Sequence, residues 1–222
     1  AIIDIPRGRI TGGSSAINGQ VFLRGIPEDF DNWARLGNDQ WSFQKVLPFL
    51  NKLETDTDFQ ENPGDFHGGN GPIICRRFTE NEWLAGSKAF VEACIDAGHQ
   101  YCEDANAPAT TGIGPMPMNN PDGIRWSTAL GYLNPSRPRL NLTIKPNVTA
   151  KKILFSLSNG KPKAIGLEVV SEGETFIVEG EEIILCAGTI GSPHILQASG
   201  IGPAKLLKDN NIEVCLLYTS DA

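Results

Sequence analysis

Apolar residues recur at three-residue steps over 27–37, and this spacing predicts a helix. Pro27 fits its first turn, and Gly37 ends it. A second run of apolar residues on one helical side follows Ser42, which is placed to cap it. Pro48 lies inside this run, so we expect a kink or a short helix there.

A third helix is predicted over 79–98, where Thr79 and Glu82 have the spacing of a capping box. The stretch 56–71 before it is polar and rich in Gly, Asn and Pro. Long connections of this kind are usually binding loops or lids, or else disordered. Residues 102–138 hold few apolar runs and many Pro, Gly and Asn, so we expect irregular backbone of the kind that lines pockets.

Beyond residue 139 the pattern changes to that of strands. Four segments alternate or run apolar: Leu140–Lys145, Thr149–Leu157, Lys163–Val170 and Thr175–Glu179. Turn residues occupy 158–160 and 172–173. This part of the chain is therefore predicted to be a series of strands joined by tight turns.

A continuous apolar run, Ile183–Ala187, predicts a strand covered on both faces, as in a parallel sheet. Gly188 breaks it, and Ser192 with Pro193 is expected to start a helix. Two more elements follow, a helix from Pro203 and a strand over Ile212–Val214. This order is that of an α/β unit, so the predicted fold class is α/β.

Composition narrows the classes of function. The 222 residues suffice for one large domain or two small ones, and 40% of them are hydrophobic. A net charge of −7 and a pI near 5.0 argue against a nucleic-acid partner. No apolar run approaches the roughly 20 residues that a transmembrane helix needs. No signal peptide is visible, and we expect a cytoplasmic protein.

The five cysteines are an odd number, and no two have C-x-x-C spacing. Cys94 and Cys186 lie inside apolar patterns and are expected to be buried thiols. We therefore expect neither a disulfide framework nor a metal site.

The stretch Gly8–Gly25, GRITGGSSAINGQVFLRG, has a low propensity for both helix and strand. Gly12 and Gly13 lack Cβ atoms, so the backbone there can lie against a planar ligand or adopt positive φ. Ser14 or Ser15 can cap the segment that follows, whose free N–H groups would face the glycines.

Polar side chains add to this pattern. Asn18 offers an amide that donates and accepts, as the edges of a flavin ring require. Arg9 and Arg24 could neutralise a diphosphate, and each could equally be a surface or salt-bridge arginine. The strand, turn and helix at 183–199 would place backbone donors beside an anion or a flat ring, although packing alone explains that turn equally well.

Together the two segments resemble the GMC (glucose–methanol–choline) oxidoreductases, which are flavoproteins. The first signature of that family is matched from Gly8 to Asp31, with Thr11 at a usually apolar position. The second, G-T-x-x-S-P-x-I-L-x-x-S-G-I-G, is matched from Gly188 to Gly202. Blocks between them extend the likeness from about Ile5 to Val214, nearest to the choline-dehydrogenase-like bacterial group.

The resemblance implies an incomplete FAD-binding, Rossmann-like domain with part of an appended substrate-binding domain. It assigns 1–214 to the FAD-binding region, with 75–138 contributing to the substrate-binding part, and leaves 215–222 as a tail expected to be non-native. It also implies oxidation of alcohol CH–OH groups, with hydride passing to flavin N5. The electron acceptor stays open.

The resemblance implies that Gly12, Gly13, Ser14, Asn18 and Gly19 lie along the FAD pyrophosphate and isoalloxazine. It further implies Arg9 at the cofactor, Val148 on the adenine side through its backbone, and Ala187 and Gly188 along the dinucleotide fold. These two regions are expected to converge on one flavin. Ile17 stands where some relatives carry a histidine bonded to flavin, so FAD is expected to bind without a covalent bond.

The catalytic histidine and the GxGxxG unit of the family are expected outside these residues, so no catalytic residue is assigned and the isolated chain is expected to be inactive. His67, His99 and His194 are expected to be structural or surface residues. Two alternatives remain open at this point. One is a hydroxynitrile lyase of the same family, and the other is a flavin-free binding module.

Overall fold

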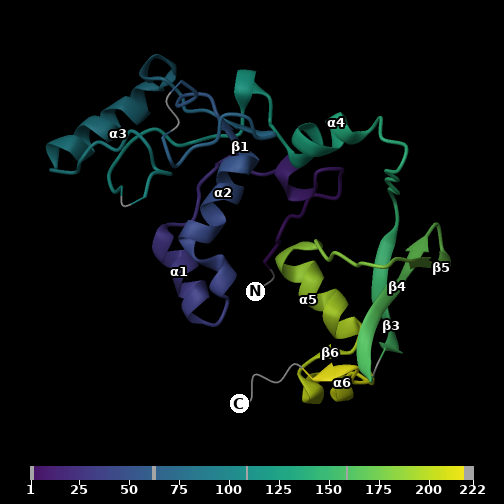
Figure 1. Cartoon of the computed structure of the whole chain (residues 1–222). Helices are drawn as coiled ribbons and strands as arrows, with labels where there is room; N and C mark the ends of the chain where they lie inside the picture. The colour runs from purple at the N-terminus through teal and green to yellow at the C-terminus, as the bar shows by residue number, and fades with distance from the viewer. Residues whose placement is uncertain (1–2, 62–63, 109, 159, 218–222) are drawn as a thin grey trace. The chain divides into compact units, whose positions relative to one another are not determined.

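The computed structural model of the chain describes residues 3–61, 64–108, 110–158 and 160–217 and separates into two compact units (Figure 1). Unit 1 is Ala1–Leu142 and unit 2 is Thr143–Ala222, each within those described ranges. Helices and strands occur in both units, in agreement with the mixed α/β class. Among the described residues, no helix combines the length and the hydrophobicity that crossing a bilayer requires.

Unit 1 consists of helices, single helical turns and one pair of short strands. Its α-helices are α1 (Pro27–Arg35), α2 (Phe43–Leu53), α3 (Ala85–Asp96) and α4 (Asn134–Ser136). The single turns are η1 (Gly13–Ala16), η2 (Asp39–Trp41), η3 (Glu80–Glu82), η4 (Pro121–Gly123) and the π-helical η5 (Ala129–Leu133). Strand β1 (Glu54–Asp56) pairs in parallel with β2 (Ile73–Cys75).

The first two helices confirm the predicted pattern. Pro27 occupies the first turn of α1, and Gly37 follows the helix with φ +94°, a conformation that favours glycine. The Phe43 N–H at the start of α2 donates to Asp31 Oδ1 at 2.9 Å, which ties the two helices together. Helix α2 runs through Pro48 for 11 residues. The proline therefore does not shorten it, because one missing N–H removes only one bond of the helix.

The third predicted helix starts later than expected. Glu82 and Thr79 do form the capping box, with the Thr79 N–H donating to Glu82 Oε2 at 2.8 Å. This box, however, caps the separate turn η3, and α3 begins only at Ala85. Gly98 follows the end of α3 with φ +93°, as predicted.

Unit 2 contains an antiparallel sheet with the strand order β3–β4–β5. The strands are β3 (Thr149–Ser158), β4 (Lys161–Ser171) and β5 (Glu174–Glu179), close to three of the predicted segments. Gly160, with φ +75°, and Gly173, with φ +88°, lie in the two turns. Positive φ at these glycines allows the tight reversals that join the strands.

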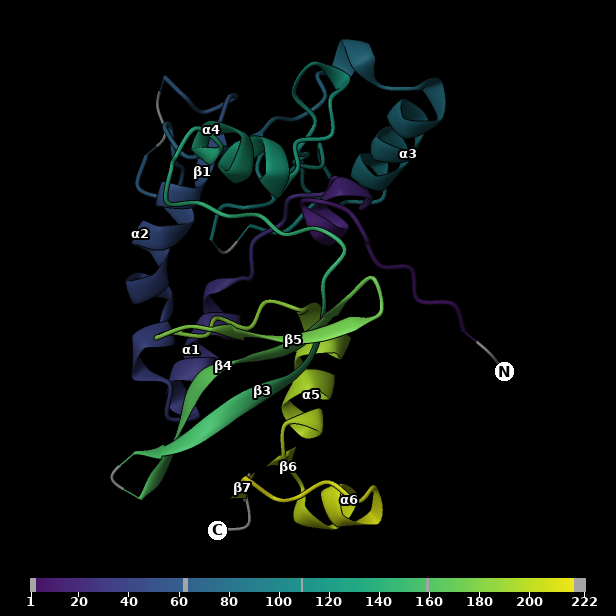
Figure 2. The same ribbon diagram turned by 90° about the vertical axis from the view of Figure 1, so that its right-hand side faces the viewer.

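Helix α5 (Gly188–Ala198) packs along β3, as Figure 2 shows. The Ile153 N–H of β3 donates to Ser199 Oγ, at the end of this helix, over 2.7 Å. Ile153 and Val169 form the buried face of the sheet, and Leu207 is 1% exposed. The remaining elements are β6 (Ile201–Gly202), α6 (Ala204–Asp209) and β7 (Leu216–Leu217), with β6 and β7 paired in parallel.

Three predicted strands are wrong. Leu140–Lys145, Ile183–Ala187 and Ile212–Val214 belong to no sheet in the described residues. An apolar run becomes a strand only where another strand satisfies its N–H and C=O groups. Within the described part of unit 2, nothing pairs with Ile183–Ala187, and Ile184 is 77% exposed.

The predicted helix start at Ser192 and Pro193 is also wrong, because α5 begins at Gly188 and contains both residues. Ser192 nevertheless acts on the turn before it. Its Oγ accepts the Ala187 N–H at 3.1 Å, so the serine closes the junction between the apolar segment and the helix.

The described cysteines are free thiols. Cys186 is exposed, so the prediction that it is buried is wrong, and Cys94 is only half-buried. The Cys186 side chain is exposed to solvent because the segment Ile183–Ala187 pairs with no strand in the described residues. Cys75 in β2 is the fully buried one, and burial together with the nearby Asp56 raises the pKa of its thiol well above the usual range.

Candidate cofactor site

The glycine-rich stretch forms a tight turn in unit 1. Gly12 precedes η1 with φ +94°, and Gly13 begins it with φ +57°. Both values lie in the left-handed region, which explains why both positions are glycines. Gly8 packs onto the turn so closely that a Cβ there would lie 2.2 Å from the Gly13 carbonyl oxygen.

Two hydroxyl groups hold this turn. Ser15 Oγ donates to the Gly12 carbonyl oxygen at 2.6 Å. It also accepts the Thr128 N–H at 3.0 Å, and Thr128 Oγ1 donates to the same Gly12 oxygen at 3.3 Å. Ser15 is therefore a structural residue of the turn.

One face of the turn is open at its glycines, and the turn also has an unused donor. Among the bonds of the described residues, the Ser14 N–H has no acceptor. Gly8 packs beside that nitrogen, since its N–H donates to Ser14 Oγ at 3.3 Å and a Cβ on it would lie 2.7 Å from the nitrogen. A Cβ at Gly13 or at Gly19 would meet no atom within 4 Å. A free N–H beside side-chain-free backbone suits a flat or anionic ligand, so these residues fit a dinucleotide cofactor.

The other predicted residues of this stretch are exposed. Asn18 Oδ1 accepts the Gln20 N–H at 3.1 Å, and its side chain lies at the surface. Arg9 is exposed and forms no ion pair within the described part of the chain. Arg9, Asn18 and Gly19 thus flank the Gly12–Ser14 turn on one continuous segment.

Unit 2 carries the remaining three predicted residues. Val148 lies directly before β3, and the paired register begins only at the next residue. Ala187 and Gly188 form the junction into α5, where Gly188 has φ +82° and open space around it. The first N–H groups of a helix lack partners within it, so this junction also offers donors.

The structure contradicts one candidate role. Arg24 is not free to neutralise a diphosphate, because its guanidinium lies 2.8 Å from Glu54 Oε2 in a buried ion pair. Its Nη1 also donates to the carbonyl oxygen of Phe66. The prediction left a salt bridge open as the alternative, and the salt bridge is what forms.

Arg24 belongs to a buried network of charges that the sequence did not reveal. It consists of Arg24, Glu54, Asp56, His67, Arg77 and Asp104. His67 lies between two carboxylates, with Nδ1 3.0 Å from Glu54 Oε1 and Nε2 2.9 Å from Asp104 Oδ2. The ring of Phe59 stacks on His67 with the ring centroids 4.6 Å apart. His67 is thus a structural histidine, as expected.

The carboxylates fix the charge of this histidine. Burial alone would lower the pKa of His67, but hydrogen bonds to Asp104 and Glu54 outweigh it and raise the pKa to about 9. For Asp104, burial works in the opposite direction, and the hydrogen bond from His67 lowers its pKa to about 2. At neutral pH the network therefore contains a charged His67 beside a charged Asp104.

Glu54, Asp56 and His67 also offer atoms within 4.8 Å of one another, a spacing that a metal ion could use. However, Arg24 and Arg77 already contact these carboxylates, with Arg77 Nη1 2.9 Å from Asp56 Oδ2. The two guanidinium groups and the charged imidazole balance the acids without a metal.

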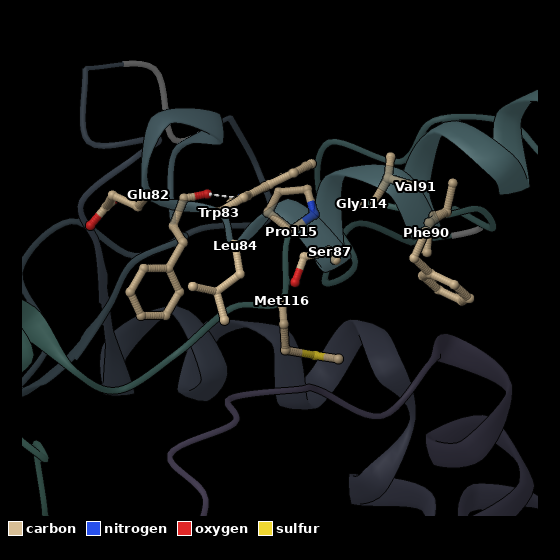
Figure 3. A pocket seen from close by; sticks show the side chains of 12 residues that line it. Glu82, Trp83, Leu84, Ser87, Phe90, Val91, Gly114, Pro115 and Met116 are labelled. Carbon is tan, nitrogen blue, oxygen red and sulfur yellow. Dashed lines mark hydrogen bonds between the residues drawn. The ribbon is translucent and has the colours of Figure 1, made fainter.

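A separate apolar pocket of about 700 Å³ lies between α3 and residues 113–116 (Figure 3). Leu84, Phe90 and Met116 line it and are more than one third exposed. Trp83, at its rim, donates from Nε1 to the Phe78 carbonyl oxygen at 2.8 Å. This pocket lies in the stretch predicted to contribute to substrate binding.

Comparison with known proteins shows the family of the chain. The profile of the GMC oxidoreductase family matches residues 1–212. An oxygen-dependent choline dehydrogenase of Stenotrophomonas maltophilia is 40% identical over 217 residues, covering 96% of this chain and 37% of that protein. A GMC-type oxidoreductase from the thcA 5′ region of Rhodococcus erythropolis is 38% identical over 212 residues, covering 96% of this chain and 41% of that protein.

Solved structures show the same fold. Pyridoxine 4-oxidase from Mesorbium loti superposes with a TM-score of 0.84 at 31% identity, over 95% of this chain and 40% of that one. An FAD-dependent oxidoreductase from Chaetomium thermophilum gives 0.85 at 32% identity, over 96% of this chain and 38% of that one. The chain thus spans about two fifths of the length of its relatives. By this match along almost its whole length, the chain belongs to the GMC oxidoreductase family, a family of FAD-dependent flavoproteins.

Proposed function

We propose that this chain is the FAD-binding part of an oxidoreductase that acts on the CH–OH group of a small alcohol. The observation that carries the proposal is the turn at Gly12–Ser14, which has positive φ, a free N–H and an open glycine face inside the matched family region. The named relatives, a choline dehydrogenase and a pyridoxine oxidase, favour oxidation of an alcohol over the lyase and the flavin-free module.

In this proposal, FAD supplies the hydride acceptor at its N5 atom, and the residues of the chain bind and orient it. The Ser14 N–H and the Arg9 guanidinium offer the positive groups that a diphosphate needs, since neither has a partner within the described residues. Asn18 offers an amide to the edge of the ring. Gly13 and Gly19 leave room for the flat ring system.

Val148, Ala187 and Gly188 of unit 2 complete the proposed site. Their support is local, because Val148 has an unpaired backbone before β3 and Gly188 opens α5 with free space beside it. We propose that both units contact the same FAD, with Val148 on the adenine side. We also propose that FAD binds without a covalent bond, because the side chain of Ile17 has no nucleophile.

The same proposal covers the rest of the chain. Residues 75–138 would contribute to the substrate-binding part, and the apolar pocket between α3 and residues 113–116 supports this. The family match ends at residue 212, which supports treating 215–222 as a non-native tail. The unpaired apolar segment Ile183–Ala187 supports further strands from a longer protein, in which 1–214 is the FAD-binding region.

The test is to purify the full-length protein that contains this chain and to record its absorption spectrum. We expect bound flavin that acid or heat releases unmodified, and anaerobic bleaching of that flavin by a small alcohol such as choline. The isolated 222-residue chain is expected to show no alcohol-dependent dye reduction. A colourless full-length protein would contradict the proposal, and aldehyde release from a cyanohydrin without flavin bleaching would replace it with a lyase.

A further inference from the structure

The peptide group between Gly12 and Gly13 is held at both of its polar atoms. Its carbonyl oxygen accepts from Ser15 Oγ at 2.6 Å and from Thr128 Oγ1 at 3.3 Å. Its N–H, on Gly13, donates to the Ile10 carbonyl oxygen at 2.8 Å. Because a peptide group is planar, these bonds fix the orientation of the whole plane. The next N–H along the chain is the free one of Ser14.

Thr128 lies 113 residues after Ser15 in the sequence. Its segment is held in unit 1 by contacts with the backbone of Pro72. Trp126 Nε1 donates to the Pro72 carbonyl oxygen at 2.8 Å, and a Cβ at Gly131 would lie 2.6 Å from that same oxygen. Gly131 sits in the π-helical turn η5, which follows Thr128 directly. Single π-helical turns are frequent at functional sites. Thr128 is therefore a fixed anchor rather than a mobile surface residue.

The two segments pack closely against each other. A Cβ at Gly12 would lie 3.2 Å from the Cβ of Ala129 and 3.3 Å from Ser127 Oγ. The turn thus rests against the start of η5 on one side and opens on the other, where Gly13 faces free space. A shift of Thr128 would be passed directly to the Gly12 carbonyl and from there to the neighbouring peptide.

We propose that Ser15 and Thr128 are positioning residues, which fix the Gly12–Gly13 peptide so that the Ser14 N–H points to the FAD. This inference rests on the proposed function. It assigns a role to hydroxyl groups that do not themselves meet the cofactor. A turn without the clamp would keep only the bond from the Gly13 N–H to Ile10, and glycine at two successive positions would then let the peptide plane tilt.

The test measures the dissociation constant for FAD in the full-length protein, first stripped of flavin and then titrated, with thermal unfolding as a second readout. Ser15→Ala removes the 2.6 Å bond to the Gly12 oxygen and the acceptor of the Thr128 N–H, and it leaves only the 3.3 Å bond from Thr128 Oγ1, so we expect FAD binding to weaken about tenfold. Thr128→Val keeps the shape and the backbone bond but loses Oγ1, so a loss of about threefold is expected. Thr128→Ser restores the hydroxyl and should stay within about twofold of wild type.

Because both hydroxyls act on one carbonyl, their effects should be coupled, and Thr128→Val added to Ser15→Ala should weaken FAD binding further by less than about threefold. Thr79→Val is the matched control. It removes a hydroxyl that reaches Glu82 Oε2 at 3.1 Å elsewhere in unit 1. We expect this control to lower the unfolding temperature slightly and to leave the FAD dissociation constant unchanged.

Wild-type affinity in Ser15→Ala or Thr128→Val, or a fully additive double variant, would overturn the clamp and leave the proposed function intact. Failure of the wild-type protein to bind FAD would instead overturn the proposed function. If Thr128→Val does not fold, Ser15→Ala carries the same test. If neither folds while Thr79→Val does, the two hydroxyls serve folding alone, and the inference is wrong.

Discussion

His67 Nε2 lies 2.9 Å from Asp104 Oδ2, and the two side chains are 7% and 10% exposed. The bond joins the loop after β1 to the irregular stretch after α3. A hydrogen bond between buried groups of opposite charge makes the stability of unit 1 depend on pH. The direction of that dependence follows from the two pKa values.

We expect unit 1 to be most stable between about pH 4 and pH 6.5. The pKa of His67 is raised from 6.5 to about 9, so its stabilisation is complete below pH 6.5 and is lost as the pH rises through 9. The pKa of Asp104 is lowered from 3.8 to about 2, so its stabilisation is complete above pH 3.8 and is lost as the pH falls through 2. Urea unfolding at a series of pH values measures the loss of stability at both the acidic and the alkaline end.

The variant His67→Gln serves as the control for that profile. It should be less stable than wild type at pH 6 and should lose the decline between pH 6.5 and pH 9. A wild-type stability that stays level up to pH 9 would show that His67 is not charged in the folded protein.

The two arginines of the glycine-rich stretch should behave oppositely. Arg24→Met leaves Oε2 of the buried Glu54 without its arginine partner, so we expect a loss of about 3–5 kcal/mol in the free energy of unfolding. Arg9→Met replaces an exposed side chain and should change the free energy of unfolding by less than about 0.5 kcal/mol. Arg9→Met should weaken FAD binding several-fold. Denaturant unfolding and flavin titration of both variants separate these outcomes, and equal effects on stability would refute the assignment.

Gly13→Val is expected to abolish most FAD binding, because its side chain would fill the open face of the turn. A valine at φ +57° is also strained, so a matched control is needed. Gly64 has the same φ of +57° and equally open space, so Gly64→Val carries the same strain outside the site. We expect similar losses of stability in both variants and a loss of bound flavin only in Gly13→Val.

Metal removal should have no effect on unit 1. The buried acids Glu54 and Asp56 are already balanced by Arg24, Arg77 and His67. We expect the unfolding temperature to be unchanged by EDTA and not to rise when zinc or manganese is added. A rise of several degrees with a stoichiometric metal would show that Glu54, Asp56 and His67 form a metal site.

Elements defined by neighbouring residues could be predicted from the sequence. Pro27 and Gly37 frame α1, and Gly160 and Gly173 mark the turns of the sheet, because each acts through its own backbone. The turn at Gly12 was predictable for the same reason. Its positive φ is a property of one residue, and glycine is the residue that adopts it at low cost.

Features that depend on distant partners could not be predicted. Ile183–Ala187 has the composition of a strand, but pairing requires a second strand that the segment itself does not specify. Arg24 could have bound a phosphate, and only the fold brings Glu54 to it. In the same way, no local pattern links Ser15 to Thr128.

The peptide group between Gly12 and Gly13, which is hydrogen-bonded at both its oxygen and its N–H, has a consequence for how the protein acquires its prosthetic group. A loop that is already ordered in the apoprotein loses little conformational entropy when the dinucleotide binds. Capture at this turn is then limited by encounter rather than by local folding, and the rate of uptake should rise in proportion to the FAD concentration without reaching a plateau.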